Sequence, residues 1–566
     1  MKRRAGVLCV AAGVLFALVA GVARAQKAIP EDADFWSDYP HEQLADFLVS
    51  RMSDEELLSQ IFMFGWNDKT TSLLQQWIGA RGLGNVKVFG WNTDDLPKVA
   101  QGIADLQRRA QARRYKIPLF IATDQEGGWI RHVKGETTVT PGNLAIGASS
   151  YPIDAYYSGY YINREIKTLG INMNFAPTVD IYTNHQSTVI GPRSFGENAA
   201  HVGELGAAFV AGSIAAGVIP TAKHFPGHGD TDADSHGKAI EIDVDVRTLN
   251  EREMLPFKYL ISENIPAIMS SHLKFPRIEP NGPPVSLSKE FLTGILRKQL
   301  HYEGLIITDD IQMNGATSYA RLSDACTLAI EAGNDIILSS ETTDLDEQLW
   351  VKNLALVRSS AAFRQTVQTA ARRVILHKLA YFKGGNAAPL YPDPATVRQS
   401  VPDPEGQAFF LSQACRSVTT YKKGTIPYRP QPGERVLLAG HQEYPEFFAE
   451  AEKRFGKCAR FPYKADMGPY HALWVHDNLI PLAQGYDTII VCVDSENNAT
   501  AIRALEALQR SGKRVIVLSI QSPVPAMNLT WADSVIFGYS YSPFSFRAMF
   551  AVLAGDFEAQ GTVPLN

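Results

Sequence analysis

Short apolar runs that alternate with helix-like stretches fill the sequence between about Asp34 and Lys383. Seven runs have the length of a buried strand: Val86–Phe89, Pro118–Ala122, Ile171–Ala176, Val218–Thr221, Ile265–Met269, Leu305–Ile307 and Asp335–Leu338. An eighth candidate lies near Leu58–Phe64. Amphipathic stretches with helical spacing separate most of the runs. This alternation predicts repeated β-α units around a parallel sheet.

Polar and ionisable residues directly follow five of these runs. The groups are Asp124 to Gly128, Pro177 with Asp180, Lys223-His224, Ser271-His272 and Asp309-Asp310. In a (β/α)8 TIM-type barrel, the carboxyl ends of the strands converge on one face, where active sites lie. A doubly wound open sheet is the alternative, but it gathers its functional groups at one switch point. Five separate strand ends favour an α/β barrel over residues 30–385.

A second α/β pattern follows the barrel region. Gly384-Gly385-Asn386 and five prolines between positions 389 and 404 indicate a linker, residues 386–405. Beyond it, Val436–Leu438, Thr488–Val493, Val515–Ile520 and Ser534–Phe537 have strand patterns, and Ala499–Ser511 has helical spacing. We predict a compact αβα sandwich over residues 406–566.

Charge and cysteine content exclude several classes of function. The net charge is −5, and no basic stripe typical of nucleic-acid-binding proteins is present, so we expect no nucleic-acid partner. The five cysteines form no C-x-x-C pair, which disfavours a disulfide scaffold or a zinc site. We expect buried free thiols. One disulfide among Cys415, Cys458 and Cys492 is the alternative.

The first 25 residues have the layout of a secretory signal peptide. A positive segment, Lys2 to Arg4, precedes an apolar run from Ala5 to Val22, and small residues follow at Ala23 and Ala25. We predict cleavage after Ala25 and export to the periplasm or the outside of the cell. An uncleaved anchor is the alternative, because the run is near the lower limit for spanning a bilayer. No later segment is apolar enough to span, so we expect no stable membrane span after cleavage.

The densest group of candidate catalytic residues runs from Lys223 to His236. Lys223 and His224 at a strand end can form hydrogen bonds to the hydroxyls of a ligand. The glycines that follow allow a sharp turn. Asp234 and His236 are two positions apart, so both can lie on one side of an extended loop. There a carboxylate orients the imidazole and raises its basicity, as general acid/base catalysis requires.

Metal binding is the less favoured reading of this cluster. The possible ligands are His224, His228, Asp230 and His236. Their spacing is not that of two histidines on one face of a helix, so we expect no metal.

Several motifs together resemble glycoside hydrolase family 3, and specifically its β-N-acetylglucosaminidases of the bacterial cell-wall recycling type. The string K-H-F-P-G-H-G-x-T-x-x-D-S-H runs from Lys223 to His236. D-Q-E-G-G begins at Asp124, N-x-A-P-x-x-D ends at Asp180, R-S-F-G begins at Arg193, and P-V-S-L-S precedes the segment G-L-I-I-T-D-D that ends at Asp310. The match runs in the same order from about Gln60 to Asp335. The C-terminal part is similar to the family's αβα domain.

The resemblance implies a retaining exo-β-N-acetylglucosaminidase that needs no cofactor. Asp309 would be the nucleophile, His236 the general acid/base and Asp234 its partner. Asp124, Arg193, Lys223 and His224 match positions that bind the sugar. For Asp124 the alternative is a strand-end cap, and for Arg193 it is a salt bridge. Where the family has an arginine four residues after the paired glycines, this chain has His132, with Arg131 before it.

The implied substrate is a glycan that carries terminal β-linked N-acetylglucosamine, such as a peptidoglycan fragment. A phosphorylase is one alternative, because a histidine acid/base repels phosphate less than a carboxylate does. A family 3 β-glucosidase is another, although the D-S-H loop argues against it. A non-catalytic binding protein is disfavoured by the complete set of Asp309, Asp234 and His236.

Overall fold

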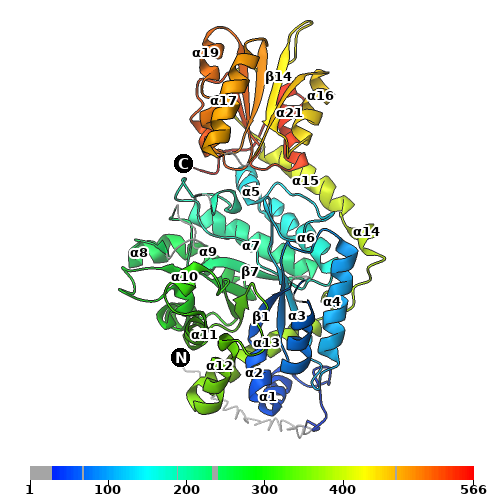
Figure 1. Cartoon of the computed structure of the whole chain (residues 1–566), viewed down its shortest axis with the longest axis vertical. Helices are drawn as coiled ribbons and strands as arrows, with labels where there is room; N and C mark the ends of the chain where they lie inside the picture. The colour runs from blue at the N-terminus through cyan, green and yellow to red at the C-terminus, as the bar shows by residue number, and fades with distance from the viewer. Residues whose placement is uncertain are drawn as a thin grey trace, which may run out of the picture.

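The computed structural model describes residues 29–66, 69, 71–187, 189–231, 240–465 and 468–565. It has two lobes, a large barrel and a smaller C-terminal domain above it (Figure 1). The predicted signal peptide, residues 1–25, lies outside the described residues. So do Asp234 and His236, which the sequence assigns to acid/base catalysis.

The large lobe is a closed parallel barrel. Its eight strands, as far as the chain is described, follow the order β11-β9-β7-β6-β3-β2-β1-β12. A bridge between Ile307 and Ile336 closes the ring between β11 and β12. The strands are β1 (Phe62–Trp66), β2 (Asn85–Val88), β3 (Phe120–Thr123), β6 (Met173–Asn174), β7 (Ile219–Phe225), β9 (Ala267–Ser270), β11 (Leu305–Thr308) and β12 (Ile337–Ser339). The predicted barrel is confirmed.

Each of the eight predicted runs overlaps one strand, but some bounds differ. Leu58 belongs to a helix, and the first strand begins at Phe62. Strand β7 continues to Phe225, so Lys223 and His224 lie within it and do not follow it as predicted. Large apolar side chains fill the interior of the barrel, including Met63, Phe120, Phe175, Met269 and Ile307. The sequence runs are continuous in hydropathy because each strand is buried on both faces, by this interior and by the surrounding helices.

Helices and short segments surround the barrel. The helices are α1 (His41–Arg51), α2 (Asp54–Gln60), α3 (Thr71–Gln76), α4 (Leu96–Gln111), α5 (Asn143–Ser149), α6 (Pro152–Thr168), α7 (Ala199–Ala216), α8 (Val246–Thr248), α9 (Leu255–Ser262), α10 (Asn314–Thr317), α11 (Leu322–Ala332), α12 (Gln348–Ser359) and α13 (Ala361–Phe382). Further helical turns are η1 (Trp77–Arg81), η2 (Gly191–Arg193), η3 (Leu249–Glu253), η4 (Val285–Leu287) and η5 (Glu290–Gln299). Short strand pairs are β4 (Gln125–Gly127) with β5 (Ile130–Arg131), and β8 (Ile240–Glu241) with β10 (Leu273–Lys274).

One helix qualifies the expectation that no segment after the leader is apolar enough to cross a bilayer. Among the described residues, α7 meets that condition by length and composition, and half of it is buried in the protein. Its glycines lie against neighbouring elements: a Cβ on Gly206 would be 2.8 Å from the Val179 side chain, and one on Gly212 would be 1.9 Å from the Tyr156 carbonyl oxygen. Close packing in the barrel wall therefore explains the apolar composition of α7.

The C-terminal domain contains a six-stranded sheet, in its described part, with the order β13-β18-β17-β16-β14-β15. Its strands are β13 (Thr419–Lys422), β14 (Val436–His441), β15 (Ala459–Tyr463), β16 (Thr488–Val493), β17 (Arg514–Ser519) and β18 (Ser534–Phe537). The four predicted strands are present. The two edge strands, β13 and β15, were not predicted, because both are partly exposed and lack a continuous apolar run.

Helices flank this sheet, in agreement with the predicted α/β class. They are α15 (Pro404–Ser417), α16 (Glu446–Phe455), α17 (Pro469–Ala483), α18 (Glu496–Ile502), α19 (Leu505–Arg510), α20 (Val524–Met527) and α21 (Pro543–Ala554). The predicted helix Ala499–Ser511 is divided by a turn at Arg503 and Ala504, with buried Ile502 and Leu505 on either side. Among the described residues, the cysteines are free, and Cys326, Cys458 and Cys492 are buried.

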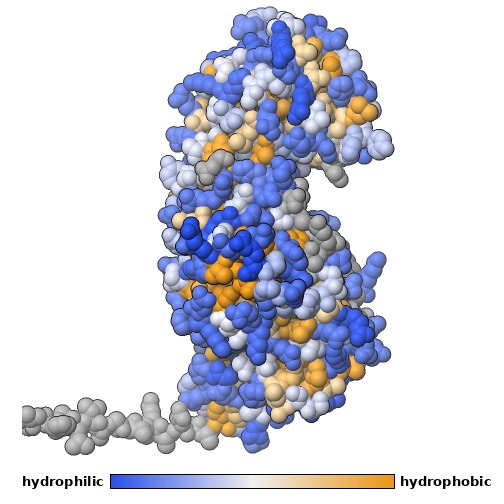
Figure 2. Space-filling model, turned by 90° about the vertical axis from the view of Figure 1, so that its left-hand side faces the viewer, coloured by the Kyte–Doolittle hydropathy of each residue, from blue (hydrophilic) through white to orange (hydrophobic). Residues whose placement is uncertain are grey.

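The two lobes are joined by buried contacts. The segment predicted as a linker includes α14 (Val397–Ser400), and the Asp403 amide donates a hydrogen bond to Glu165 Oε1 at 2.9 Å. From the C-terminal domain, Ser542 Oγ donates to the Val139 carbonyl at 2.7 Å. Figure 1 shows α5 directly beneath this domain, and all seven residues of α5 are buried. Figure 2 shows a mainly hydrophilic surface with apolar patches on both lobes.

Candidate active site

A cavity of about 190 Å³ lies at the carboxyl ends of the barrel strands. It brings together five residues predicted from the sequence: Asp124, Arg193, Lys223, His224 and Asp309. The other lining residues are Lys87, Phe89, Glu126, Ile130, His132, Phe175, Val189, His228, Met269, Asp310, Met313 and Leu338. Five of the predicted residues, from four separate segments, thus converge on one small polar pocket.

Asp124, directly after β3, is held between two lysines. Its Oδ1 lies 2.5 Å from Lys223 Nζ, and its Oδ2 lies 2.5 Å from Lys87 Nζ. Burial alone would raise the pKa of Asp124, but the two ammonium groups outweigh it and hold the pKa well below its usual range. The carboxylate therefore stays ionised and can only accept hydrogen bonds. These contacts of the Asp124 side chain are ion pairs with lysines, whereas the alternative of a strand-end cap involves hydrogen bonds to backbone groups.

Glu126 connects Arg193 to the same network. The guanidinium donates twice to this carboxylate, from Nε at 2.9 Å and from Nη2 at 2.7 Å, and Lys223 Nζ lies 2.6 Å from Glu126 Oε1. Although burial opposes ionisation, Arg193 and Lys223 lower the pKa of Glu126 to about 2. The salt bridge considered for Arg193 is thus present, on a side chain that also lines the cavity.

His224 is oriented by Asp180, on the loop after β6. The ring Nδ1 lies 2.7 Å from Asp180 Oδ2, and Asp180 Oδ1 accepts hydrogen bonds from the backbone amides of His224 and His228. One carboxylate therefore fixes both the imidazole and the start of the glycine-rich loop. Burial, together with nearby His224, lowers the pKa of His228 to about 4, so this ring is neutral near pH 7.

Asp309 follows β11, and its position is fixed by backbone contacts. Its amide donates to the Ser270 carbonyl at 2.9 Å, and its Oδ1 accepts from the Asp310 amide at 2.8 Å. Burial would raise the pKa of Asp309, but electrostatic interaction with the imidazoles of His224 and His272 and the hydrogen bond from the Asp310 amide lower it. Asp309 is therefore an ionised carboxylate that faces the cavity.

Asp310 has a structural role beside Asp309. Its Oδ1 accepts hydrogen bonds from the amides of Gln312 at 3.1 Å and Ser340 at 2.9 Å. These bonds join the loop after β11 to the loop after β12. They hold the backbone that positions Asp309.

The structure shows where His132, which replaces the family's arginine, and the neighbouring Arg131 point. Arg131 turns away from the cavity and donates to the carbonyls of Lys134 and Thr137. His132 faces the cavity instead, with Nδ1 3.1 Å from Lys87 Nζ. Burial and the Lys87 charge lower the pKa of His132 to about 4. On this side of the cavity, the positive charge is therefore carried by Lys87, and His132 is neutral near pH 7.

Lys87 and Glu126 are contributors that sequence reasoning missed. Lys87 lies within the apolar run of β2 and is only 1% exposed, so a single lysine among strand residues was the available signal. Glu126 was visible as part of a motif. Its bonds to Arg193 and Lys223 join positions far apart in the sequence, so they appear only in the folded chain.

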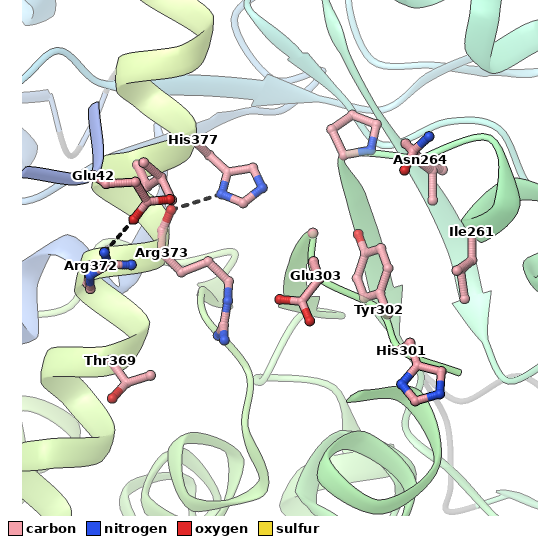
Figure 3. Close-up of a pocket in the computed structure, with 14 residues that line it drawn as sticks. Glu42, Ile261, Asn264, His301, Tyr302, Glu303, Thr369, Arg372, Arg373 and His377 are labelled. Atoms are coloured by element: carbon pink, nitrogen blue, oxygen red, sulfur yellow. Dashed lines mark hydrogen bonds and ion pairs between the residues drawn. The ribbon is translucent and has the colours of Figure 1, made fainter. Parts of the chain in front are cut away.

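A larger cavity of about 570 Å³ lies at the opposite end of the barrel, between the segments before β9 and β11 and helix α13 (Figure 3). Its arginines are already paired: Arg372 with Glu42, and Arg373 with Asp335. Because barrel enzymes act at the carboxyl ends of their strands, the smaller cavity is the candidate site. In the described part of the chain, no three His, Cys, Asp or Glu residues are grouped to hold a metal ion.

Comparisons with known proteins show the family to which the barrel region belongs. The profile described as "Glycosyl hydrolase family 3 N terminal domain" matches residues 52–376, which include the five converging residues. "Beta-hexosaminidase A" of Pseudoalteromonas piscicida is 37% identical over 281 residues, which are 47% of this chain and 47% of that protein. A "Beta-hexosaminidase" of Haemophilus influenzae is 36% identical over 238 residues, 41% of this chain and 66% of that one. The match thus spans about half the length of the first relative.

Solved structures match almost the whole chain. A glycoside hydrolase family 3 β-N-acetylglucosaminidase from Paenibacillus sp. str. FPU-7 has a TM-score of 0.81 and 27% identity, and the match covers 91% of this chain and 99% of that one. A β-glucoside phosphorylase, with a TM-score of 0.78 and 22% identity, shares the fold. The family predicted from the motifs is confirmed: this chain belongs to glycosyl hydrolase family 3.

Proposed function

We propose that this protein is a retaining exo-β-N-acetylglucosaminidase. The observation that carries the proposal is an ionised Asp309 in a one-sugar pocket whose other polar residues are arranged to bind hydroxyls. The names of similar proteins add support. The two sequence relatives described above are named β-hexosaminidases, and the similar solved structure from Paenibacillus is named a β-N-acetylglucosaminidase. Family membership and the pocket together support glycoside hydrolysis.

In the proposed first step, an Asp309 carboxylate oxygen attacks the anomeric carbon while a general acid protonates the leaving oxygen. A covalent glycosyl-enzyme forms, and the leaving group departs as an alcohol. Water then attacks the same carbon, the base removes its proton, and the sugar is released with retention. A nucleophile must be ionised, and the lowered pKa of Asp309 meets this requirement.

We assign the general acid/base to His236, with Asp234 as its partner. Both lie outside the described residues, between Thr231 and Ile240. The assignment is supported by the loop's origin, because His224 and His228, which precede it, line the cavity. His236→Ala should slow turnover at least about a hundredfold, the lower end of the range for loss of acid/base catalysis.

We further propose that the pocket grips the non-reducing sugar through opposed donors and acceptors. Asp124 and Glu126 can accept from hydroxyls, while Lys223, Arg193 and His224 can donate to them. A cavity of about 190 Å³ suits one sugar unit, which favours release from a chain end. With the predicted signal peptide, this suggests peptidoglycan fragments outside the cytoplasm as substrate.

The test is hydrolysis of an aryl β-N-acetylglucosaminide beside the matching aryl β-glucoside, with and without phosphate. We expect preference for the acetamido sugar and free sugar as product. Sugar 1-phosphate formed only with phosphate would instead identify a phosphorylase. Preference for the glucoside would remove the acetamido specificity.

The nucleophile is tested by Asp309→Asn and Asp309→Gly. Asp309→Asn should lose roughly four orders of magnitude in kcat, as removal of a nucleophile does elsewhere. Azide added to Asp309→Gly should displace the aryl leaving group and give the α-glycosyl azide, because it attacks from the vacated face. The exposed residue Asp477, on α17 of the C-terminal domain, provides a control as Asp477→Asn, which should retain activity. Normal turnover by Asp309→Asn would exclude this carboxylate as nucleophile.

A further inference from the structure

An exposed tryptophan lies beside the candidate site. Trp91 follows β2 and is 57% exposed, and its ring stacks on Phe89 at a centroid distance of 4.5 Å and an angle of 14°. Phe89 in turn lines the cavity. The aromatic stack therefore leads from the cavity wall to solvent.

The inner end of this stack is anchored on the charged network. Lys87 Nζ lies 4.3 Å from the centre of the Phe89 ring, a favourable position for a cation over an aromatic face. The same ammonium group binds Asp124. His132 also lies against Phe89, with ring centroids 5.6 Å apart. Phe89 is thus packed between residues of the pocket and the exposed Trp91.

The loop that carries Trp91 is fixed to the neighbouring loop. Thr93 Oγ1 donates to the His132 carbonyl at 2.6 Å and accepts from the Lys134 amide at 3.2 Å. At Gly90, a Cβ would lie 3.3 Å from the His132 carbonyl oxygen, so the two backbones are in close contact. Trp91 is therefore held in position before any ligand arrives, which reduces the entropy lost on binding.

We propose that Trp91, supported by Phe89, is the binding platform for the sugar unit on the leaving-group side of the scissile bond. The inference rests on the proposed function. The pocket has room for about one sugar, so the next unit of a glycan must emerge at the mouth. A pyranose presents an apolar C–H face, which a broad aromatic ring covers well, while its hydroxyls remain hydrated. The ligand class is consequently an oligosaccharide rather than a glycoside with a small alkyl group.

The experiment compares N,N′-diacetylchitobiose with methyl β-N-acetylglucosaminide, which lacks a second ring. In Trp91→Ala, we expect kcat/KM for the disaccharide to fall about three- to tenfold, the range of one aromatic contact, with the methyl glycoside unchanged. Trp91→Phe should restore most of the disaccharide activity. The control is Trp36→Ala, which removes another exposed tryptophan, one that is hydrogen-bonded to Gln111.

The two levels of proposal fail differently. No turnover of either substrate by the wild-type protein would overturn the proposed function. Normal wild-type turnover, with Trp91→Ala lowering both substrates equally or neither, would overturn the platform. A selective loss on the disaccharide that Trp91→Phe recovers would support it, because a general loss of folding affects both substrates alike.

Discussion

At the scale of residues, the pocket is a network of buried ion pairs. Three cationic side chains, Lys87, Lys223 and Arg193, surround the carboxylates of Asp124 and Glu126. Removing one member leaves its buried partner uncompensated, which costs more than an exposed ion pair contributes. The network therefore keeps donors and acceptors fixed for a neutral, hydroxyl-rich ligand.

Lys87→Met tests the contribution of the lysine that the sequence did not reveal. It removes one of the two cations beside Asp124, so the pKa of Asp124 should rise. We expect kcat/KM to fall at least roughly tenfold, because a hydrogen bond between charged groups is lost. The acid side of the pH–rate profile should move to higher pH. Lys116→Met, which breaks an ion pair with Asp34, is the control and should leave the profile unchanged.

Glu253 predicts a dependence of stability on pH. It is 1% exposed beside Gly227, and burial raises its pKa to about 7 despite Arg252. Between an unfolded pKa of about 4.3 and this value, the folded state holds a proton that the unfolded state has released. Its contribution is complete below about pH 4.3 and is lost as the pH rises through about 7, a difference of roughly 4 kcal/mol.

Urea unfolding at pH 5 and pH 8 measures this effect in wild type and in Glu253→Gln. The neutral glutamine removes the titration, so the variant should lose less unfolding free energy between the two pH values. Equal losses in both proteins would contradict the role of Glu253.

The sequence predicted those site residues whose position depends only on their place near the end of a strand. Asp124 and Asp309 directly follow strands, and Lys223 lies near the carboxyl end of β7, so topology brings the three together. Pairings between side chains could not be predicted, because neither the bond between Glu126 and Arg193 nor the inward rotation of His132 has a local signal. The roles of Asp234 and His236 stay predictions.

At the scale of elements, strands buried on both faces were the easiest to predict. β16 was predicted residue for residue, whereas β15 alternates buried and exposed positions at the sheet edge. Helix breaks were harder, since apolar spacing continues across the turn between α18 and α19. Close packing between helices, such as that of α6 against α7, is indicated in the sequence only by glycines.

Gly212→Ala tests that packing. The new Cβ would lie 1.9 Å from the Tyr156 carbonyl oxygen, so α6 and α7 must move apart. We expect a loss of roughly 3 kcal/mol in unfolding free energy, at the upper end for overpacking. Gly79→Ala is the control, because its Cβ meets only the Arg109 side chain, at 3.5 Å. Thermal unfolding followed by circular dichroism distinguishes them; equal melting temperatures would show that the helices have room.

At the scale of the whole molecule, the two domains behave in this structure as parts of one packed body. Asp154 on α6 is fully buried and accepts hydrogen bonds from Nε at 3.1 Å and Nη2 at 2.5 Å of Arg416 on α15. The Thr562 amide donates to the Ala148 carbonyl at 3.0 Å, and the Glu197 amide donates to the Pro564 carbonyl at 3.1 Å. Such contacts should couple the unfolding of the domains.

Arg416→Met measures the coupling. It leaves the Asp154 carboxylate buried without its guanidinium, and we expect a loss of roughly 2 kcal/mol, moderated by the partial exposure of Arg416. The single unfolding transition expected for wild type should then broaden or separate into two in calorimetry. Arg503→Met, at an exposed pair with Glu496, should change nothing measurable. An unchanged single transition in Arg416→Met would indicate that other contacts carry the coupling.

The position of helix α5 determines which segment can be exchanged when chimeras are made between relatives. This helix belongs to the barrel by sequence, yet all seven of its residues are buried. A Cβ on Gly147 of α5 would lie 1.7 Å from the Phe195 carbonyl oxygen and 3.2 Å from the Pro564 side chain. Helix α5 is therefore packed against both the barrel and the C-terminal segment. A chimera that exchanges only residues after the barrel would combine two surfaces that never evolved against each other. The natural unit of exchange is therefore the C-terminal domain together with α5.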